Sequence, residues 1–126
     1  MRVEVKNWWE QAKKDLHAAK NSLNSGDYEW ASFQSNQSAE KALKALHIEQ
    51  KKTNIASHNL IRIGEAVSVP KDIKESLIDL NPEYTISRYP DVANAIPSEM
   101  YSERKASEKI KHAENVIKWT EKQLKQ

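Results

Sequence analysis

Two long stretches near the start of the chain repeat their apolar residues every three or four positions, and this spacing limits the possible folds most strongly. The first runs from about Val3 to Leu23 and the second from about Tyr28 to Lys52. Between them, Gly26 is placed to end one helix and Asp27 to cap the next. Because the connection is short, we expect two long, antiparallel, amphipathic helices. The apolar positions of the first are Trp8, Ala12, Leu16, Ala19 and Leu23, and those of the second are Ala39, Ala42, Leu43 and Leu46.

Three more helices are expected downstream. Ser57 is the expected N-cap of a short helix that ends by Pro70, and Pro70 opens a fourth helix that reaches Leu80. The last helix is expected from about Ser102 to Leu124, capped by Ser98 or Ser102. The chain of 126 residues has only 2 glycines and is rich in strong helix formers. The sequence therefore predicts a single all-α domain of about five helices over residues 1–126.

Composition argues against several classes of function. The chain carries 20 basic and 18 acidic residues, so its net charge of +2 provides no broad attraction to nucleic acid. It has no cysteine, and no two of His17, His47, His58 and His112 stand three or four residues apart, so neither a metal site nor a cofactor is expected. No apolar run reaches the roughly 18 residues of a membrane span, and the first residues do not form a signal peptide. We expect a cytoplasmic protein that does not enter the membrane.

The segment Ser87–Asn94 is the one part of the chain that helix formation does not explain. It contains Pro90, and two more of the chain's 4 prolines, Pro82 and Pro97, frame it. Proline interrupts helices because it lacks a backbone N–H and its ring clashes with the preceding turn. We therefore expect an exposed, constrained connection between Pro82 and Pro97, and this is the first place to look for function.

Arg88 lies at the centre of this connection, close in sequence to Tyr84 and Tyr89. A guanidinium can bind a phosphate at two points, and tyrosine rings can stack on a base or a ribose, so this combination suits a nucleotide. The alternative is structural: Asp91 is three residues away, and an Arg88–Asp91 salt bridge would fold the loop while the tyrosines pack. Both interpretations remain open from the sequence.

The long second helix carries polar groups beside its apolar positions. Phe33, Gln37, Glu40, Lys41 and Lys44 follow one adjoining face. One interpretation is a solvated face with a helix-stabilising Glu40–Lys44 pair at i,i+4. The other is that Gln37, Glu40 and Lys44 line a polar groove or a subunit interface.

These residues together resemble the HEPN domain (higher eukaryotes and prokaryotes nucleotide-binding). The two most specific blocks are Gln37-x-x-Glu40-Lys41-x-x-Lys44-Ala45 and Arg88-Tyr89-Pro90-Asp91. The resemblance implies an up-and-down helical bundle, usually a two-fold homodimer, often encoded beside a small nucleotidyltransferase in a toxin–antitoxin-like pair. Many such domains are metal-independent ribonucleases, in which an arginine and a histidine that follows it after four to six residues form a composite site across the dimer.

This chain departs from that signature. After Arg88 the histidine window holds Ala93, Asn94 and Ala95, and the amide of Asn94 can form hydrogen bonds but cannot exchange a proton near neutral pH. His58, at the start of a helix, is the remaining candidate base, although a structural, hydrogen-bonded role is the alternative. The first hypothesis is therefore a nucleotide- or RNA-binding partner of a small nucleotidyltransferase, with little catalysis. Its expected binding residues are Arg88, Tyr84, Tyr89, Asp91, Gln37 and Lys44. The second is an endoribonuclease using Arg88 with His58 or Asn94, and the third is a structural module whose loop serves only dimerisation.

Overall fold

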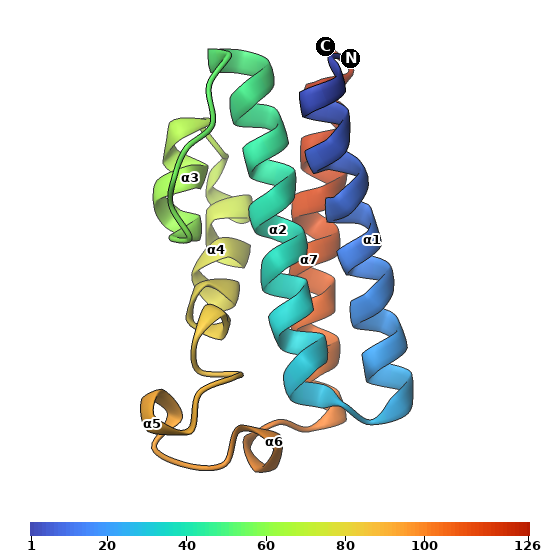
Figure 1. Cartoon of the computed structure of the whole chain (residues 1–126), viewed down its shortest axis with the longest axis vertical. Coiled ribbons are helices and arrows are strands. Elements are labelled where there is room, and N and C mark those ends of the chain that lie inside the picture. Colours follow the sequence, from blue (N-terminus) through green and yellow to red (C-terminus); the bar gives the residue numbers. More distant parts are fainter.

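The computed structural model describes residues 1–126 and contains no strands, which confirms the all-α fold (Figure 1). Three long helices form a bundle, two shorter helices pack along one side of it and two single-turn helices lie at one end, and one 3-10 turn, η1, follows α4. None of the helices combines the length and the apolar character that crossing a bilayer requires. The elements are α1 (Val3–Ser25), α2 (Tyr28–Lys51), α3 (Leu60–Ala66), α4 (Lys71–Leu80), η1 (Asn81–Tyr84), α5 (Pro90–Ala93), α6 (Pro97–Met100) and α7 (Glu103–Leu124).

The first two helices form the antiparallel pair that the sequence predicts (Figure 1). α1 ends at Gly26, whose φ of 85° is the left-handed conformation that glycine adopts without strain. Asp27 occupies the N-cap position of α2, but its side chain does not cap the helix; it accepts a hydrogen bond from the Ser25 hydroxyl instead, at 3.1 Å. The turn therefore depends on Gly26 more than on an acidic cap.

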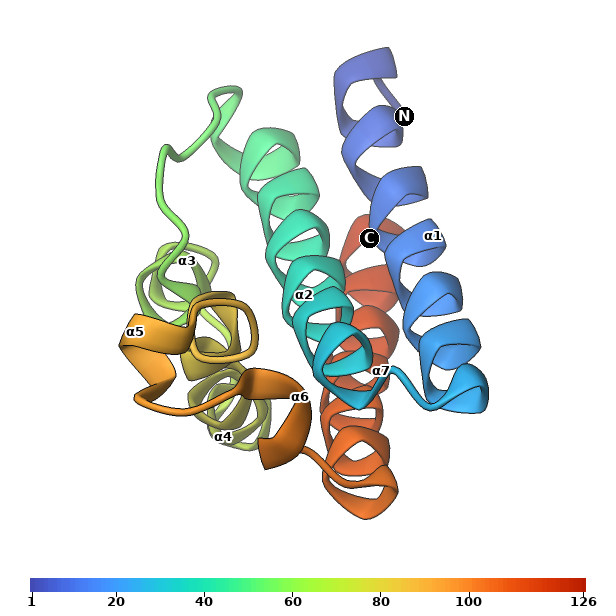
Figure 2. The same cartoon turned by 60° about the horizontal axis from the view of Figure 1, so that its bottom comes forward.

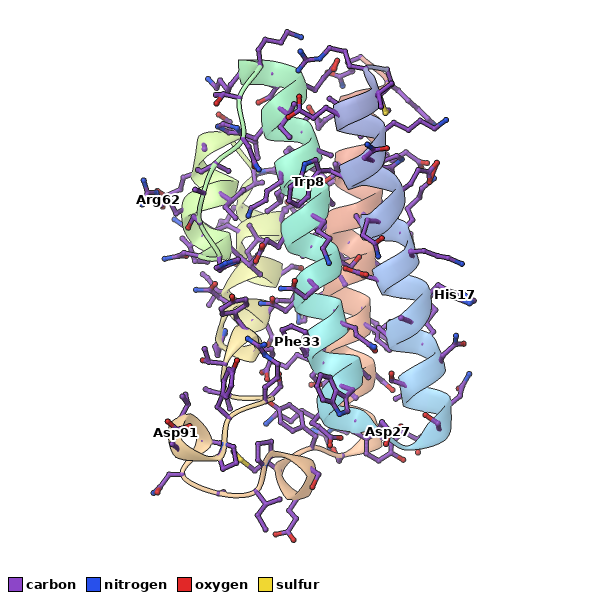
Figure 3. The ribbon with its side chains drawn as sticks, in the orientation of Figure 1. Trp8, His17, Asp27, Phe33, Arg62 and Asp91 are labelled. Atoms are coloured by element: carbon purple, nitrogen blue, oxygen red, sulfur yellow. The ribbon has the colours of Figure 1, made fainter.

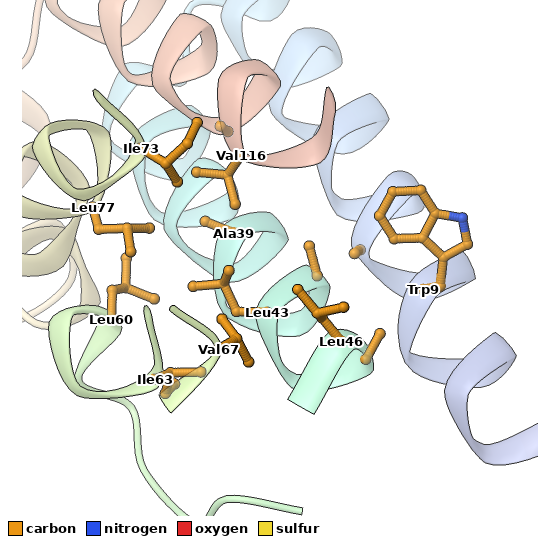
Figure 4. Close-up of a cluster of buried hydrophobic side chains, with 14 of the residues drawn as sticks. Trp9, Ala39, Leu43, Leu46, Leu60, Ile63, Val67, Ile73, Leu77 and Val116 are labelled. Carbon is orange, nitrogen blue, oxygen red and sulfur yellow. The ribbon is translucent and has the colours of Figure 1, made fainter. Parts of the chain in front are cut away.

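α2 is the central helix, because it contacts α1, α3, α4, α6, α7 and η1. Small residues on α2 let α1 approach closely: the Ser38 hydroxyl donates a hydrogen bond across the interface to the Ala12 carbonyl at 2.8 Å. Leu43 and Leu46 are fully buried within the core cluster (Figure 4). Each such leucine contributes about 1.5–3 kcal/mol by burial, so packing rather than helix propensity holds α2 in place.

The third helix begins later than the sequence suggests. Asn59, not Ser57, is its N-cap: the Asn59 side chain accepts hydrogen bonds from the backbone N–H groups of Ile61 and Arg62 at 3.0 and 3.3 Å. The Ser57 hydroxyl instead accepts from the Asn59 N–H at 3.1 Å. Both residue types are good caps, and the sequence alone does not distinguish positions two residues apart. The expected boundaries of the fourth and last helices are confirmed, with Ser102 capping α7.

The Asn59 cap gives a first prediction. Asn59→Ala should lower the free energy of unfolding by about 1 kcal/mol, because two N–H groups of α3 lose their partner. Ser57→Ala, the matched control, should cost less than about 0.5 kcal/mol, since it removes a contact outside the helix. Urea unfolding followed by circular dichroism measures both. An equal loss in the two variants would contradict the assignment of the cap.

The proline-rich connection is more ordered than expected. The stretch between Pro82 and Pro97, predicted as a constrained loop, contains the end of η1 and the short helices α5 and α6, and Pro90 and Pro97 each stand at the start of one of them. Proline fits there because the first N–H groups of a helix need no partner within it. Figure 2 shows this segment crossing the end of the bundle, from the side of α4 to the start of α7.

Candidate functional site

Arg88 lies among three aromatic rings on the surface between α2 and the connection. Its guanidinium carbon is 4.2 Å from the ring centre of Phe33, 4.9 Å from that of Tyr84 and 4.7 Å from that of Tyr89. The Arg88 Nε and Nη2 groups both donate to the Tyr84 carbonyl, Nε at 2.8 Å. The expected alternative, an Arg88–Asp91 salt bridge, is absent: Asp91 is exposed and forms no ion pair.

The local backbone brings Tyr84 and Arg88 together. The N–H groups of Arg88 and Tyr89 both donate to the Thr85 carbonyl at 3.0 Å, and the Ser87 hydroxyl donates to the Glu83 carbonyl. These bonds continue a helical turn beyond η1, which places residues four apart above one another. Asp91, one turn further along, lies on α5 at the edge of the molecule, away from Phe33 on α2 (Figure 3).

A second part of the site joins His58 to Tyr84. The two rings stack with their centres 4.4 Å apart and an angle of 14° between their planes. His58 Nδ1 lies 3.0 Å from Glu40 Oε2, and the same oxygen is 3.2 Å from Lys44 Nζ. The Glu40–Lys44 pair exists as predicted, but it does not lie on a solvated face, since only 4% and 6% of the two side chains are exposed. The Trp8 ring of α1, whose centre is 5.5 Å from Lys44 Nζ, and the His58 ring lie against this pair.

Gln37 and Asn94, two more of the predicted residues, form no hydrogen bond with this cluster. Gln37 donates to Asn36 on its own helix at 3.1 Å. Asn94 is exposed and ends α5 with a φ of 54°, a left-handed conformation that asparagine tolerates better than most residues. That backbone position gives Asn94 a structural role. Within residues 1–126, no group of three or more acidic or histidine side chains lies close enough together to hold a metal ion.

An open groove lies beside Arg88, on the side of α6. Its volume is about 220 Å³, and Trp30, Arg88 and Ile96 are among its lining residues. Glu29 is the other charged group there. The half-exposed Trp30 meets Phe33 edge to face at 6.1 Å, which extends the aromatic surface toward the groove. No motif in the sequence singles out Trp30, although its position three residues before Phe33 puts it on the same helix face.

A buried polar network supports the turn that carries Arg88. Lys109 of α7 donates to both the carbonyl and the carboxylate of Asp79 at 2.8 Å, and its ammonium lies 3.2 Å from Glu83 Oε2. The Tyr101 hydroxyl donates to the other oxygen of Glu83. Glu83 and Lys109 are nearly fully buried. No sequence pattern indicates this network, because Glu83 lies in a segment that the sequence predicts to be a loop.

Tyr101 makes stability depend on pH. Burial, and then the hydrogen bond to Glu83, raise the pKa of Tyr101 above its ordinary value of 10. The unfolded chain therefore releases this proton at lower pH than the folded protein. Ionisation of Tyr101 should leave the free energy of unfolding unchanged below about pH 10 and lower it progressively above that pH. Urea unfolding between pH 8 and 11 should show a steeper loss for the wild type than for Tyr101→Phe. Tyr89→Phe, which changes an exposed tyrosine, should keep the wild-type slope; identical slopes in all three proteins would contradict the prediction.

The fold is an all-α bundle with an arginine–aromatic surface at one end of α2. Comparison with known families identifies the family to which such a chain belongs. The family model of the HEPN domain matches residues 5–123. The chain belongs to the HEPN family, as the sequence resemblance predicts. No curated protein matches it.

Solved structures agree with this assignment. TT1696 from Thermus thermophilus superposes with a TM-score of 0.89 at 33% identity, over 97% of this chain and 99% of that one. ST0689, an archaeal HEPN homologue, superposes with a TM-score of 0.82 at 36% identity, with 98% of each chain covered. A HEPN domain protein from Thermotoga maritima gives 0.75 at 28% identity, over 95% of this chain and 98% of that one. The similarity therefore extends along almost the whole length of all three proteins.

Proposed function

We propose that this single HEPN domain binds a nucleotide or RNA at the surface formed by Arg88, Tyr84 and Tyr89, with His58 at its border and little catalysis of its own. The observation that carries the proposal is the orientation of Arg88. Two of its nitrogens are held by the Tyr84 carbonyl, and three rings surround the guanidinium while the side chain stays partly exposed. The free edge of such a fixed guanidinium is suited to a phosphate, and the half-exposed Tyr89 ring to a base.

The direct test is a binding measurement. Fluorescence anisotropy with labelled ATP and with a short single-stranded RNA should show saturable binding that weakens as salt concentration rises, because phosphate contacts displace counterions. Absence of binding to either probe at low salt would overturn the proposal. Gln37, Lys44 and Asp91, which the sequence hypothesis includes among the binding residues, form no hydrogen bond or ion pair with Arg88. Substituting them should affect binding less than changes at Arg88.

We further propose that the domain works as a homodimer beside a small nucleotidyltransferase, in a toxin–antitoxin-like pair. Family membership supports this, as do the exposed apolar side chains of Val92, Ile96 and Met100 between α5 and the end of α6. A two-fold dimer would cover the same side chains on both copies. Light scattering should give twice the mass of one chain, and co-expression with a nucleotidyltransferase encoded beside it should yield a stable complex. A monomer that forms no such complex would exclude this arrangement.

One observation favours a second function, a metal-independent endoribonuclease. His58 stacks on the same Tyr84 ring that Arg88 contacts, so a histidine is present at the site although none follows Arg88. In such a reaction His58 would take the proton of a 2′-hydroxyl while that oxygen bonds to the adjacent phosphorus. The bond to the 5′-oxygen would break, this oxygen would take a proton from solvent, and Arg88 would stabilise the phosphoryl charge. RNA cleavage in EDTA that Arg88→Ala abolishes would establish this function over the first.

A further inference from the structure

His58 is exposed, yet one edge of its ring is fixed by a buried carboxylate. Its side chain is 57% exposed, whereas Glu40, from the middle of α2, is only 4% exposed. The 3.0 Å contact joins His58 Nδ1 to Glu40 Oε2. Since the other oxygen of Glu40 is buried without a hydrogen-bond partner, Oε2 carries all the polar contacts of this carboxylate.

This contact decides which ring nitrogen carries the hydrogen. A carboxylate can only accept, so Nδ1 must be the donor, both in the neutral and in the protonated imidazole. In the neutral ring the lone pair is therefore on Nε2, at the edge of the ring that points away from Glu40. His58 thus offers an incoming ligand a hydrogen-bond acceptor at a fixed position.

The surrounding groups hold this arrangement from three elements. Lys44 on α2 pairs with the same Glu40 oxygen at 3.2 Å, and Tyr84 of η1 stacks on the ring and limits its rotation. Arg88, on the turn after η1, contacts Tyr84 as well. Glu40 and Lys44 carry opposite charges and pair with each other, whereas Arg88 contacts Tyr84 without a carboxylate partner.

We infer that the buried Glu40 positions His58 so that its Nε2 accepts a hydrogen bond from the 2′-hydroxyl of a ribonucleotide, and that the site therefore prefers RNA over DNA. The inference rests on the proposed binding function, in which Arg88 holds a phosphate. Arg88 and His58 contact the same Tyr84 ring, so one nucleotide can reach both. The group that a ribonucleotide adds to a deoxyribonucleotide is a hydroxyl donor, which matches an acceptor at Nε2. Glu40 and Lys44 are positioning residues, because they act through His58.

The tautomer can be measured without any ligand. In 15N-labelled protein above the pH at which histidines titrate, long-range ring correlations should show the His58 hydrogen on Nδ1. In the double variant Glu40→Met with Lys44→Met, which removes the acceptor without leaving either charge unpaired, the two tautomers should coexist. His47 is an internal control in the same spectra. Its Nδ1 lies 2.7 Å from the Thr53 carbonyl, so its hydrogen should stay on Nδ1 in both proteins.

The consequence for binding is measured with an RNA and a DNA oligonucleotide of one sequence, at pH 8. The wild type should prefer the RNA by about three- to tenfold, the effect of one neutral hydrogen bond. His58→Phe, which keeps a ring to stack on Tyr84, and the Glu40/Lys44 double variant should both lose this preference while still binding DNA. A role limited to folding would weaken both ligands together.

Each outcome decides one of the two claims. Equal affinity of the wild type for RNA and DNA, or a His58 hydrogen found on Nε2, overturns the inference and leaves the proposed binding function in place. No binding to either oligonucleotide overturns the proposed function and, with it, the inference. A preference for RNA that survives in His58→Phe assigns the discrimination to another residue and also overturns the inference.

Discussion

Replacing Arg88 with alanine should weaken the binding of nucleotide or RNA by roughly 10- to 100-fold, the largest functional effect expected of any single change in this chain. This range corresponds to the loss of charge-assisted hydrogen bonds to a phosphate. The variant should still fold, because Arg88 lies at the surface and its removal leaves no buried charge unpaired. Anisotropy titrations at constant salt measure the effect, and thermal unfolding checks the fold.

Two controls separate the geometry of Arg88 from its charge. Arg62 is an exposed arginine that points outward from α3 (Figure 3), so Arg62→Ala removes the same charge and should change affinity less than about threefold. Arg88→Lys keeps the charge but loses the planar fork and its stacking, and it should recover only part of the affinity. Equal losses in Arg62→Ala and Arg88→Ala would show that binding reflects overall charge, and the proposed site would be wrong.

The largest loss of stability is expected from Lys109→Met. Lys109 is buried and contacts both Asp79 and Glu83, and its removal leaves the Glu83 carboxylate buried with only the Tyr101 hydroxyl. Breaking a buried pair from one side costs about 3–5 kcal/mol, so the free energy of unfolding should fall by that amount. Urea unfolding at pH 7 measures it.

The controls for Lys109 test the origin of this loss. Arg104→Met removes one member of an exposed pair with Glu108 and should change stability by less than about 0.5 kcal/mol. Adding Glu83→Gln to Lys109→Met should restore part of the lost stability, because an amide is cheaper to bury than an unpaired carboxylate. A Lys109→Met variant no less stable than Arg104→Met would refute the importance of the network. A measurable loss of ligand affinity in Lys109→Met would show that the network also positions Arg88.

The helices were predictable from sequence because their signals are local and periodic. The α1 and α2 patterns extend over about six turns each, and Gly26 marks the end of the first without ambiguity. The start of α3 was not predictable in this way. Ser57 and Asn59 both satisfy the rules for a cap, and only the position of Leu60 in the core decides between them. The connection after η1 was predicted as irregular because α5 and α6 have only four residues each, which is too short to show a helical period in the sequence.

Only part of the candidate site could be predicted from the sequence. The guanidinium of Arg88 and its two tyrosines lie within six residues, so their proximity was predictable. Its partner from α2, Phe33, and the contact between Glu40 and His58 join residues far apart in the chain, and no local pattern reports such distances. The expected salt bridge to Asp91 failed for a specific reason: the Tyr84 carbonyl fixes one edge of the guanidinium among three rings, whereas Asp91 lies on α5, away from Phe33.

The central place of α2 also has a consequence for synthesis on the ribosome. α2 leaves the exit tunnel early, but one of its two long neighbours, α7, follows only after about fifty more residues have been added. Until then the nascent chain can pair α1 with α2 while the buried positions that Ala113 and Val116 later cover remain open to water. Chaperones that bind apolar segments should therefore recognise ribosome-bound chains that stop before Glu103 and release those in which α7 has emerged.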